Sequence, residues 1–531
     1  MKRIHFLLAS LILAACAATT TSEPSGITFV HLNDTYRVGD VEDGTAGGFG
    51  RVVTVVRGLQ ADGRDVRILH GGDFLYPSLE SSLWQGEQMV DAMNFMDAIA
   101  PLYAVGGNHE FDPRTPNSLI NAVKKSAFDW LGDNYQFTTG DADVDGALKS
   151  AFTFESGGKT IGIFSLSIHP DDGGNSRPYL PMQKNYVPIA KRVIEDFESR
   201  GVDAIVGLTH LDIGQDTEIA SLRADHPRFV FVAGGHEHEP EYSPLSHNAA
   251  AIVKGASNAR VIWAIDLEFD SAGMPSIDPR QVVLDEHVPT DAQYAVLATK
   301  WRDRMLEIYP FLEARIGEAA TPLDGREVTV RNEESNWATF IADQMRGAFG
   351  KPAADFAFVN GGTLRIDDII HGDIRFEHIG RTFGFSSYLR HTSVSGAEFK
   401  QVMEAGYRGF GPSKGYFPQF SGFRVCVDRS RNEGERIVSL QVPLNGVDGG
   451  WAEISDDRQY SLVVPDFLYG GGDGYEIPKD RPASRPSSEL IYLVLDAILD
   501  AQSRGEKVGA TINVNNRRYH ELLEGKQPCF E

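Results

Sequence analysis

Side chains that bind metal ions follow five short apolar runs in the first half of the chain. They comprise two carboxylates, one carboxamide and several imidazoles: Asp34, Asp73, Asn108 with His109, His210, His236 and His238. In open α/β sheets, ligands bind outside the carboxyl ends of the strands, so five strand ends can converge on one point. Carboxylate, amide and imidazole groups suit divalent metal ions. We therefore expect a centre for two divalent ions, with Mn, Zn, Mg and Ca all compatible with these ligands.

One carboxylate in such a centre must bridge two ions that lie roughly 3.5–4 Å apart. Asp73 is the expected bridge, because the two glycines before it allow a sharp backbone turn. Asp34 is the expected terminal ligand of the first metal, and His238 reaches the same ion. The remaining ligands are expected on the second metal: Asn108, His210 and His236. An Asp after a strand is often only a helix N-cap, and a single His is often structural. Five strand ends with ligand side chains together favour the metal centre.

The sequence pattern of residues 27 to about 285 indicates the strands and helices that must position these ligands. Near-continuous apolar runs, typical of strands buried on both faces, alternate with helical patterns at 47–63, 82–97 and 188–201. Three further strand-like runs carry no ligands: 159–167, 251–257 and 261–270. These additional runs indicate more sheet than a single layer.

A second unit follows a connecting segment. From Asp291 to about Gly317 the sequence has the pattern of a long amphipathic helix, interrupted at Pro310. From about residue 320, a helix, a strand that runs into the motif NGGTLR, further strands and a closing helix form another α/β pattern. A chain of 531 residues is too long for one ordinary core, so two domains are expected. A hinge is expected within 291–325.

The composition excludes some classes of partner. The chain has a formal net charge of −24 at pH 7 and 42% hydrophobic residues. This is the composition of a globular protein, and the acidity argues against nucleic-acid binding, which needs a basic surface. A small phosphorylated substrate stays compatible, because metal ions and a few arginines reverse the sign of the charge inside one cleft. The sequence does not indicate an oligomeric state.

The first 25 residues have the pattern of an export signal. Two basic residues precede an apolar stretch from Phe6 to Ala15, which is too short to span a membrane. The sequence LAAC, ending at Cys16, resembles a bacterial lipobox, in which the cysteine is lipidated and anchors the protein in a membrane. We expect a signal peptide at 1–16 and a flexible tether at 17–25; an ordinary cleaved signal is the alternative. The resemblance implies the periplasm or the outer membrane of a Gram-negative bacterium.

Two further cysteines, Cys426 and Cys529, lie in the second unit. In an oxidising compartment they can pair and tie the C-terminal tail to a strand. The alternative is a buried free thiol at Cys426 and an exposed one at Cys529. The sequence leaves both alternatives open.

Five motifs occur in a fixed order: NDxx at Asp34, GGD at Asp73, GNHE at Asn108, TH at His210 and GHxH at His236. In this order they resemble the calcineurin-like metallophosphatases, and GNHEFD with the second-unit motifs resembles the 5'-nucleotidase family. The resemblance covers nearly all of the mature chain. It implies an α/β fold in three parts: a four-layer αββα metallophosphatase domain at 26–290, a linker helix at 291–319 and a smaller α/β substrate-binding domain at 320–531.

The resemblance also implies a reaction. A metal-bound water or hydroxide would hydrolyse the phosphate monoester of nucleoside 5'-monophosphates. His109 would be catalytic and donate a hydrogen bond to the phosphoryl group, while Asp112 would orient this histidine and keep it protonated. Alternatives within the family are a 2',3'-cyclic nucleotide phosphodiesterase, a nucleotide-sugar hydrolase and a sulfur-compound hydrolase. A non-catalytic nucleotide-binding lipoprotein is the alternative from another class.

One position departs from the family pattern. The first motif usually has a histidine ligand of the first metal two residues after the aspartate, where this chain has Tyr36. Tyrosine has an unperturbed pKa of about 10, so it would bind as a phenolate only to a strongly acidifying ion such as Fe(III). Tyr76, in GDFLY, resembles the iron-binding tyrosine of purple acid phosphatases. Both tyrosines are possible metal ligands; the alternative is that they only pack beside the site and water fills the coordination position.

In the second domain, the resemblance places residues that read the substrate. Arg365, in NGGTLR, would hold the phosphate bidentately. Phe417 and Phe467 would sandwich the nucleobase, an interaction that tolerates any base. Asp473 would accept hydrogen bonds from the ribose hydroxyls. Two arginines are candidates for the remaining phosphate contacts of the family: Arg381 and Arg390.

Overall fold

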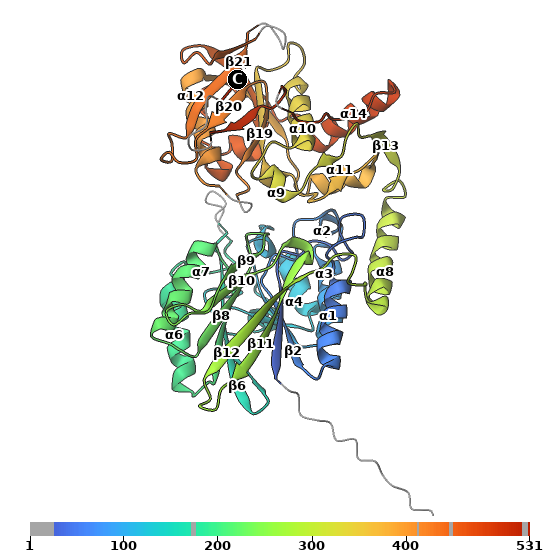
Figure 1. Cartoon of the computed structure of the whole chain (residues 1–531). Coiled ribbons are helices and arrows are strands. Elements are labelled where there is room, and N and C mark those ends of the chain that lie inside the picture. The colour runs from blue at the N-terminus through green and yellow to red at the C-terminus, as the bar shows by residue number, and fades with distance from the viewer. Residues whose placement is uncertain are drawn as a thin grey trace, which may run out of the picture.

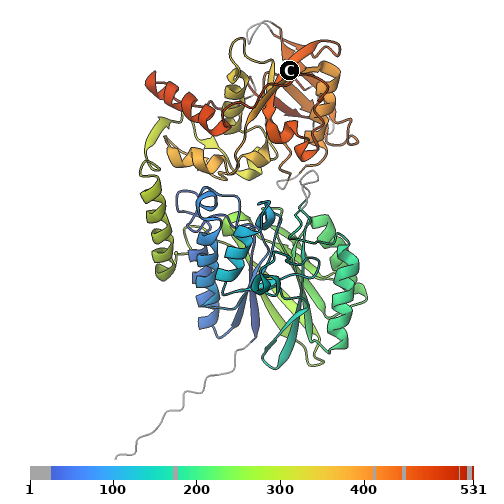
Figure 2. The same cartoon turned by 180° about the vertical axis from the view of Figure 1, so that it is seen from behind.

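The computed structural model describes residues 26–170, 177–410, 414–444, 450–513, 515–522 and 529–530. The expected signal peptide, the lipidated Cys16 and the tether at 17–25 lie outside these residues. Two domains are stacked on one another, and a long helix runs along the side on which they are joined (Figure 1, Figure 2). Within the described part of the chain, no helix combines the length and the apolarity needed to cross a membrane.

The first domain contains two six-stranded sheets. In the first sheet, β1 to β4 are parallel, β11 is antiparallel to β1, and β12 is antiparallel to β11. The order is β12 (Pro275–Val283), β11 (Val261–Phe269), β1 (Ile27–Leu32), β2 (Asp65–His70), β3 (Leu102–Val105), β4 (Asp129–Leu131). In the second sheet, the four central strands are parallel; the order is β5 (Phe152–Ser156), β6 (Lys159–Ser167), β7 (Ala204–His210), β8 (Phe229–Gly234), β10 (Ala251–Lys254), β9 (Glu241–Ser243).

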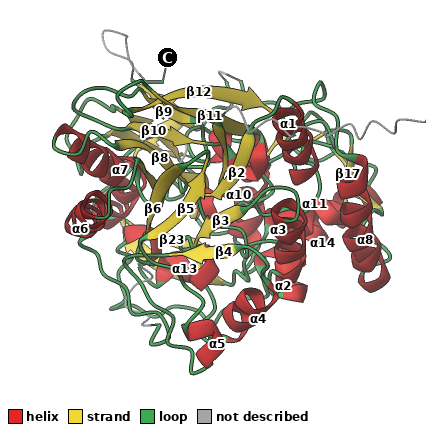
Figure 3. Cartoon of the chain, turned by 90° about the horizontal axis from the view of Figure 1, so that it is seen from below, coloured by secondary structure: helices red, strands yellow, loops and turns green. Residues whose placement is uncertain are grey.

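The two sheets pack face to face, and helices cover their outer faces (Figure 3). All six residues of β1 are buried, and Phe29 in this strand packs edge-on against Phe154 and Phe231 of the other sheet. On the side of the first sheet, α1 (Phe49–Ala61) and α3 (Glu87–Asp97) contact its strands, and α2 (Leu79–Trp84) and α4 (Asn117–Lys125) contact α3. Two helices cover the second sheet: α6 (Tyr186–Ser199) and α7 (Ile213–Ala220). A short helix, α5 (Ala142–Asp145), contacts α4. This layering confirms the predicted αββα fold.

The helix predicted at 82–97 is in fact two helices, α2 and α3. The side chain of Ser78 caps α2 by accepting a hydrogen bond from the Ser81 backbone N–H. Between the two helices, Gln85 has a φ of 54° and Gly86 a φ of 85°. Two successive residues in the left-handed region cannot continue a right-handed helix, so the chain turns there.

The connecting helix α8 (Ala292–Ile308) packs on the first domain. Its N-cap Asp291 accepts hydrogen bonds from two backbone N–H groups of the first turn. Its buried face contacts α1 and α3, where Tyr294 packs against Phe49 and Phe95. The helix ends shortly before Pro310, whose ring cannot continue a helical backbone. The next strand, β13 (Arg315–Glu318), already pairs within the second domain.

In its described residues, the second domain is built around two four-stranded sheets and two short strand pairs. One sheet has the order β18 (Leu389–Ser395), β23 (Gln459–Pro465), β15 (Phe356–Asn360), β19 (Pro418–Ser421). The other has the order β22 (Trp451–Glu453), β21 (Ile437–Pro443), β20 (Arg424–Val427), β24 (Tyr519–Glu521). The short pairs are β13 with β17 (Asp373–Arg375) and β14 (Leu323–Asp324) with β16 (Ile369–Ile370).

Helices complete the second domain: α9 (Glu327–Val330), α10 (Asn336–Gly347), α11 (Phe376–Thr382), α12 (Gly396–Glu404), α13 (Asp466–Tyr469) and α14 (Leu490–Ser503). Trp337 on α10 and the apolar face of α14 belong to one core cluster, and Phe356 of β15 belongs to a second. The smaller α/β domain expected after the linker is therefore present.

A disulfide bond joins Cys426 in β20 to Cys529, with a Cα–Cα distance of 5.8 Å. The bond therefore ties Cys529 to a central strand of the sheet β22-β21-β20-β24 in the second domain, next to the pairing of β20 with β24. Of the two alternatives that the sequence left open for these cysteines, the structure has the paired one.

Candidate metal centre and substrate cleft

The predicted ligands converge where the carboxyl ends of the two sheets of the first domain meet. Strands β1, β2 and β3 of the first sheet and β7 and β8 of the second lead into them: Asp34, Asp73, Asn108, His210, His236 and His238. Four of these six have a left-handed backbone, with φ of 52° at Asp34, 57° at Asp73, 88° at His236 and 65° at His238. Such a conformation costs on the order of 1–3 kcal/mol per residue and gathers at functional sites.

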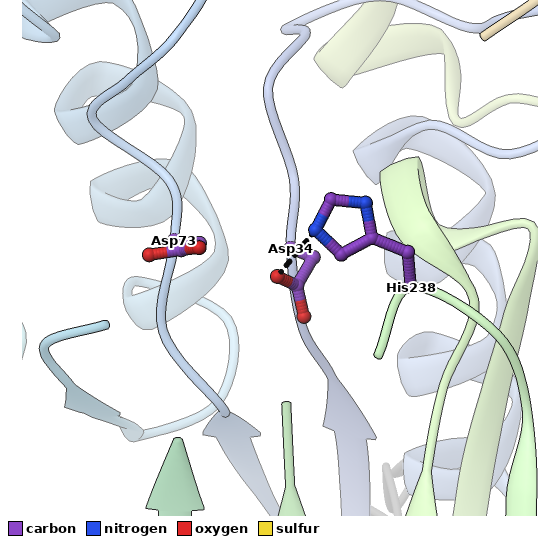
Figure 4. A group of neighbouring side chains, drawn as sticks. All are labelled: Asp34, Asp73 and His238. Carbon is purple, nitrogen blue, oxygen red and sulfur yellow. Dashed lines mark ion pairs between the residues drawn. The ribbon is translucent and has the colours of Figure 1, made fainter. Parts of the chain in front are cut away.

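Asp34, Asp73 and His238 form a compact, buried group. Their ligand atoms all lie within 4.8 Å of one another, and Figure 4 shows the His238 ring facing the Asp34 carboxylate, with Asp73 on a neighbouring segment. The Nε2 atom of His238 is 3.1 Å from Oδ1 of Asp34. The hydroxyl of Tyr36 is 3.0 Å from the same Nε2 and 3.4 Å from the same Oδ1. Tyr36 thus lies at the expected first-metal position, where the resemblance implied a histidine.

His210, Asn108 and Asp73 form the adjoining half of the site. Nε2 of His210 is 3.3 Å from Oδ2 of Asp73 and 3.2 Å from Oδ1 of Asn108. Nδ1 of His210 is 2.6 Å from the Gly71 carbonyl oxygen, so it carries the proton and leaves Nε2 free for a ligand. The ring of His236 lies 5.3 Å from that of His210. Asp73 therefore contacts His210 in this half of the site and also belongs to the group with Asp34 and His238. A bridging ligand needs this placement.

The buried carboxylates of the site stay charged and attract positive charge. Burial works against ionisation, but neighbouring histidines hold the pKa of Asp34 well below its usual range and lower the pKa of Asp73 to about 2. Burial likewise disfavours imidazolium, yet the carboxylates raise the pKa of His210 to about 10 and the pKa of His238 to about 9. For His236, burial and the nearby His210 lower the pKa to about 3. A cluster of this kind fits divalent cations, which supply the charge that the histidines otherwise take up as protons.

His109 lies beside the ligands and is held by Asp112. The His109 backbone N–H donates to Oδ1 of Asp73 at 2.8 Å, and its Nδ1 is 2.8 Å from Oδ2 of Asp112. The remaining nitrogen, Nε2, lies 4.0 Å from Oδ2 of Asp73. Burial disfavours the charged ring, but Asp112 and Asp73 outweigh this effect and raise the pKa of His109. The imidazole is thus oriented with one nitrogen toward the site.

Glu110 has a structural role that the sequence did not reveal. Its carboxylate accepts hydrogen bonds from the backbone N–H groups of Asp73, Phe74, Leu75 and Gly107. It therefore fixes the loop that carries the expected bridging aspartate to the loop that carries Asn108 and His109. The approach is so close that a Cβ atom on Gly107 would lie 2.2 Å from Oδ1 of Asp73. The glutamate of the GNHE motif is Glu110, so the motif contained the sequence signal that could have indicated this role.

Tyr76 lies apart from the ligands. Its hydroxyl bonds to Ser118 on α4, and its ring packs on the core of the first domain. Among the contacts of the described residues, none joins Tyr76 to the six predicted ligands. The structure therefore brings Tyr36 to the site and leaves Tyr76 outside it.

The second domain places Arg365 over the ligands. This arginine follows β15, and its guanidinium carbon lies 5.2 Å from the centre of the Tyr36 ring. Its Nη1 is 3.4 Å from Glu327, and its buried Nη2 has no hydrogen-bond partner among the described residues. Arg381 lines the same small pocket as Tyr36 and Arg365. Arg390 instead donates to the Ser484 carbonyl oxygen within its own domain.

The aromatic residues of the second domain are placed differently from the expectation. Phe417 is 1% exposed and packs between Tyr407 and Tyr519 in a core cluster, so no base can stack on it. Phe467 is 51% exposed. The expected pairing of Phe417 with Phe467 around a base is therefore wrong for Phe417. Like most phenylalanines beside an apolar strand, Phe417 belongs to the core.

Phe385 is an exposed aromatic residue that the sequence did not single out. Its ring centre lies 6.0 Å from that of His109 and 6.0 Å from the Arg365 guanidinium carbon. It precedes β18, whose Leu389 pairs with Pro465 of β23, and Phe467 follows that second strand. Two exposed phenylalanines thus project from the ends of paired strands. No sequence signal distinguished Phe385, because its position beside His109 results from the docking of the two domains.

Asp473 and Asn360 lie together on the second domain. The Asn360 side-chain amide donates to Oδ2 of Asp473 at 2.8 Å, and Arg408 donates to the Asp473 carbonyl oxygen. Gly472, which precedes Asp473, lies against the ring of Phe467. The predicted ribose contact and the exposed aromatic residue are therefore neighbours.

Comparison with known proteins identifies first the class and then the family. Residues 27–240 match the family model of calcineurin-like phosphoesterases, so the chain is a metal-dependent phosphoesterase whose class uses a two-metal centre. Residues 315–480 match the 5'-nucleotidase C-terminal domain. The chain belongs to the 5'-nucleotidase family, in which these two domains are joined. Its membership supports metal-dependent hydrolysis of nucleotide phosphoesters.

Individual proteins match the chain over most of its length. The snake venom 5'-nucleotidase of Gloydius brevicauda is 25% identical over 528 residues, which cover 91% of this chain and 88% of the relative. The solved structure of a 5'-nucleotidase precursor from Thermus thermophilus aligns with a TM-score of 0.79 and 22% identity, over 94% of this chain and 99% of that one. The sulfate thiohydrolase SoxB of Thermus thermophilus aligns with a TM-score of 0.70 and 18% identity, over 95% and 98% of the two chains. At these identities the two solved structures bear on the fold alone.

Proposed function

We propose that this protein removes the phosphate group from nucleoside 5'-monophosphates. The observation that carries the proposal is the position of Arg365 of the second domain: its guanidinium lies over the Tyr36 ring and interacts electrostatically with Asp73 and Asp112, and its Nη2 has no hydrogen-bond partner among the described residues. A phosphate monoester is a dianion that guanidinium groups bind bidentately. The names of the relatives, which include 5'-nucleotidases from snake venom and mammals, support a nucleotide as the ester.

Six side chains would hold two divalent ions. We assign Asp34 and His238 to the first ion, Asp73 to both, and three residues to the second: Asn108, His210 and His236. When bound, such ions supply Lewis-acid chemistry, because they neutralise charge on phosphoryl oxygens and lower the pKa of water. Mn, Zn, Mg and Ca are the candidates. Tyr36 faces the first position and is retained as a possible ligand, for which iron would be the favoured ion.

His109 and Asp112 are the proposed catalytic pair. With Nδ1 held by Asp112, the Nε2–H group of His109 can donate to an oxygen of the phosphoryl group as negative charge develops there. The Asp112 carboxylate stabilises the protonated ring and fixes its orientation. The pair needs no covalent intermediate on the protein.

We propose Phe385 and Phe467 as the residues that hold the nucleobase, in place of the pair that contained Phe417. Both rings are exposed and emerge beside the paired strands β18 and β23. Asp473 lies close to Phe467 and would accept hydrogen bonds from the ribose. Because stacking is tolerant of base identity, we expect several nucleotides to be substrates.

A panel of phosphate esters tests this proposal. Metal-loaded protein should release phosphate from nucleoside 5'-monophosphates faster than from ribose 5-phosphate, 3'-monophosphates, 2',3'-cyclic nucleotides and nucleotide sugars. Preference for the cyclic or sugar nucleotides would replace the proposal with one of those family activities. Equal rates on ribose 5-phosphate would remove the role of the base. Nucleotide binding without release of phosphate would favour the non-catalytic alternative.

Export and lipid anchoring through Cys16 remain part of the proposal. The disulfide between Cys426 and Cys529 supports an oxidising compartment, where such bonds persist. Mass spectrometry of the mature N-terminus would identify a diacylglyceryl group on Cys16. A mature chain that starts at another residue would contradict the anchor.

A further inference from the structure

The half of the site that contains Asp34 and His238 is covered by the second domain. The side chain of His238 is 5% exposed and that of Asp34 is fully buried. In the other half, the side chain of His236 is 27% exposed and that of its neighbour Asp212 is 41% exposed. His238 at the expected first position is therefore more deeply buried than His236 at the expected second position.

Glu327, at the start of α9 in the second domain, reaches His238 directly. One carboxylate oxygen, Oε2, accepts a hydrogen bond from Nδ1 of His238. The other oxygen, Oε1, lies 2.6 Å from Nη2 of Arg331 and 3.4 Å from Nη1 of Arg365. Two arginines of its own domain thus hold Glu327 in place while it crosses the domain boundary. The imidazole is left with Nε2 directed at Asp34.

A second set of contacts supports the same half of the site. Asp367 of the second domain accepts a hydrogen bond from the Ser257 hydroxyl at 2.7 Å and also pairs with Arg260. The backbone N–H of Ser257 donates to the His238 carbonyl oxygen at 2.8 Å. Asp367 also accepts the backbone N–H of Glu327 at 3.0 Å. Asp367 therefore bonds both to the loop behind His238 and to the backbone of Glu327 in front of it.

We propose that Glu327 is a positioning residue for His238, and that it makes occupation of the first metal position and engagement of the two domains depend on each other. A carboxylate on Nδ1 fixes the tautomer and the ring orientation of a ligating histidine, and its loss typically weakens metal binding about 10–100-fold. Coupling between two binding events is reciprocal, so a metal held by His238 favours the docked domains as much as docking favours the metal. This inference rests on the proposed ligation by His238.

Metal affinity in three variants tests the proposal. Chelator competition with Mn²⁺ or Zn²⁺ should show two bound ions per wild-type chain. In Glu327→Ala, one of the two should bind about 10–100-fold more weakly and be released faster, while the other is unchanged. Glu327→Gln should lose less, because its amide oxygen still accepts the Nδ1–H bond. Glu80→Gln is the matched control: this carboxylate faces Arg381 across the same domain boundary at 4.0 Å without touching a ligand. It should bind both ions as the wild type does.

Domain engagement gives a readout that does not depend on activity. Small-angle scattering of the wild type should show a larger radius of gyration after chelation, and metal-loaded Glu327→Ala should resemble the chelated wild type. Unchanged affinity for both ions in Glu327→Ala and Glu327→Gln would overturn the inference, and so would an equal loss in Glu80→Gln. If Glu327→Ala does not fold, the intermediate loss expected of Glu327→Gln decides. A wild type that binds no metal would instead contradict the proposed function.

Discussion

Three histidines of the candidate site share one arrangement. In each, a protein acceptor holds Nδ1, and Nε2 is directed at the ligand cluster: Asp112 holds His109, the Gly71 carbonyl holds His210, and Glu327 holds His238. The acceptor fixes both the tautomer and the rotation of the ring. Two of the acceptors are carboxylates, those that hold His109 and His238, and the third is the neutral carbonyl that holds His210. Under the proposed function, groups that do not touch the substrate therefore orient the histidines that bind metal or act on the phosphoryl group.

Substitution of His109 should remove catalysis without removing the metals. For His109→Asn we expect kcat to fall roughly 10²–10³-fold, because a donor to the developing charge is lost. For Asp112→Asn we expect a smaller loss of about tenfold, since the ring remains but is less well oriented. Steady-state kinetics with metal content measured on the same samples checks both. A His109→Asn variant with wild-type kcat would show that another group donates to the phosphoryl oxygens.

The two phenylalanines Phe385 and Phe417 should behave in opposite ways. Loss of stacking on a base costs about 1–3 kcal/mol, so Phe385→Ala should raise KM for a nucleotide about tenfold with little change in thermal stability. Phe417→Ala removes a buried ring, so it should destabilise the fold by about 3–5 kcal/mol. Kinetics and thermal melts on both variants separate these roles. If Phe417→Ala changed KM alone, the buried position of its ring would not describe the protein in solution.

At the scale of elements, the carboxyl ends of the strands explain which ligands could be predicted from the sequence. Each predicted ligand follows an apolar run, and the topology of parallel strands brings such ends to one edge whatever the details of packing. Asp34, Asp73 and His210 could therefore be placed before the structure. Glu327 and Phe385 could not, because they act across the domain boundary and no spacing in the sequence encodes that docking. The break between α2 and α3 was also missed, because it depends on the left-handed backbone at Gln85.

The disulfide should stabilise the second domain. It closes a loop of 103 residues between β20 and the end of the chain. Cys529→Ser should therefore lower the free energy of unfolding by about 2–5 kcal/mol. Chemical unfolding followed by tryptophan fluorescence measures this change. As a control, a reducing agent should bring the wild type to the stability of the variant and leave the variant unaffected. Equal stability of both proteins under oxidising conditions would contradict this role.

For the whole molecule, the proposed function depends on both domains, because each supplies part of the candidate site. The first domain carries the ligands and the His109–Asp112 pair, and the second carries Arg365 and the exposed aromatic residues. At the domain boundary, His238 is 5% exposed and bonds to Glu327 of the second domain, whereas His236 is 27% exposed. This asymmetry is compatible with substrate entry on the more open side. The hinge expected within 291–325 would lie at the end of α8, where the chain passes from one domain to the other.

The most direct test is the activity of metal-free protein as metal is returned. Phosphate release from a nucleoside 5'-monophosphate should be absent in the chelated protein and should saturate when two equivalents of Mn²⁺ or Zn²⁺ per chain are bound. Asp73→Asn, which alters the only ligand assigned to both ions, should lower the affinity for both equivalents. Full activity in the chelated protein, or saturation at a single equivalent, would contradict a two-metal centre built from the five strand ends.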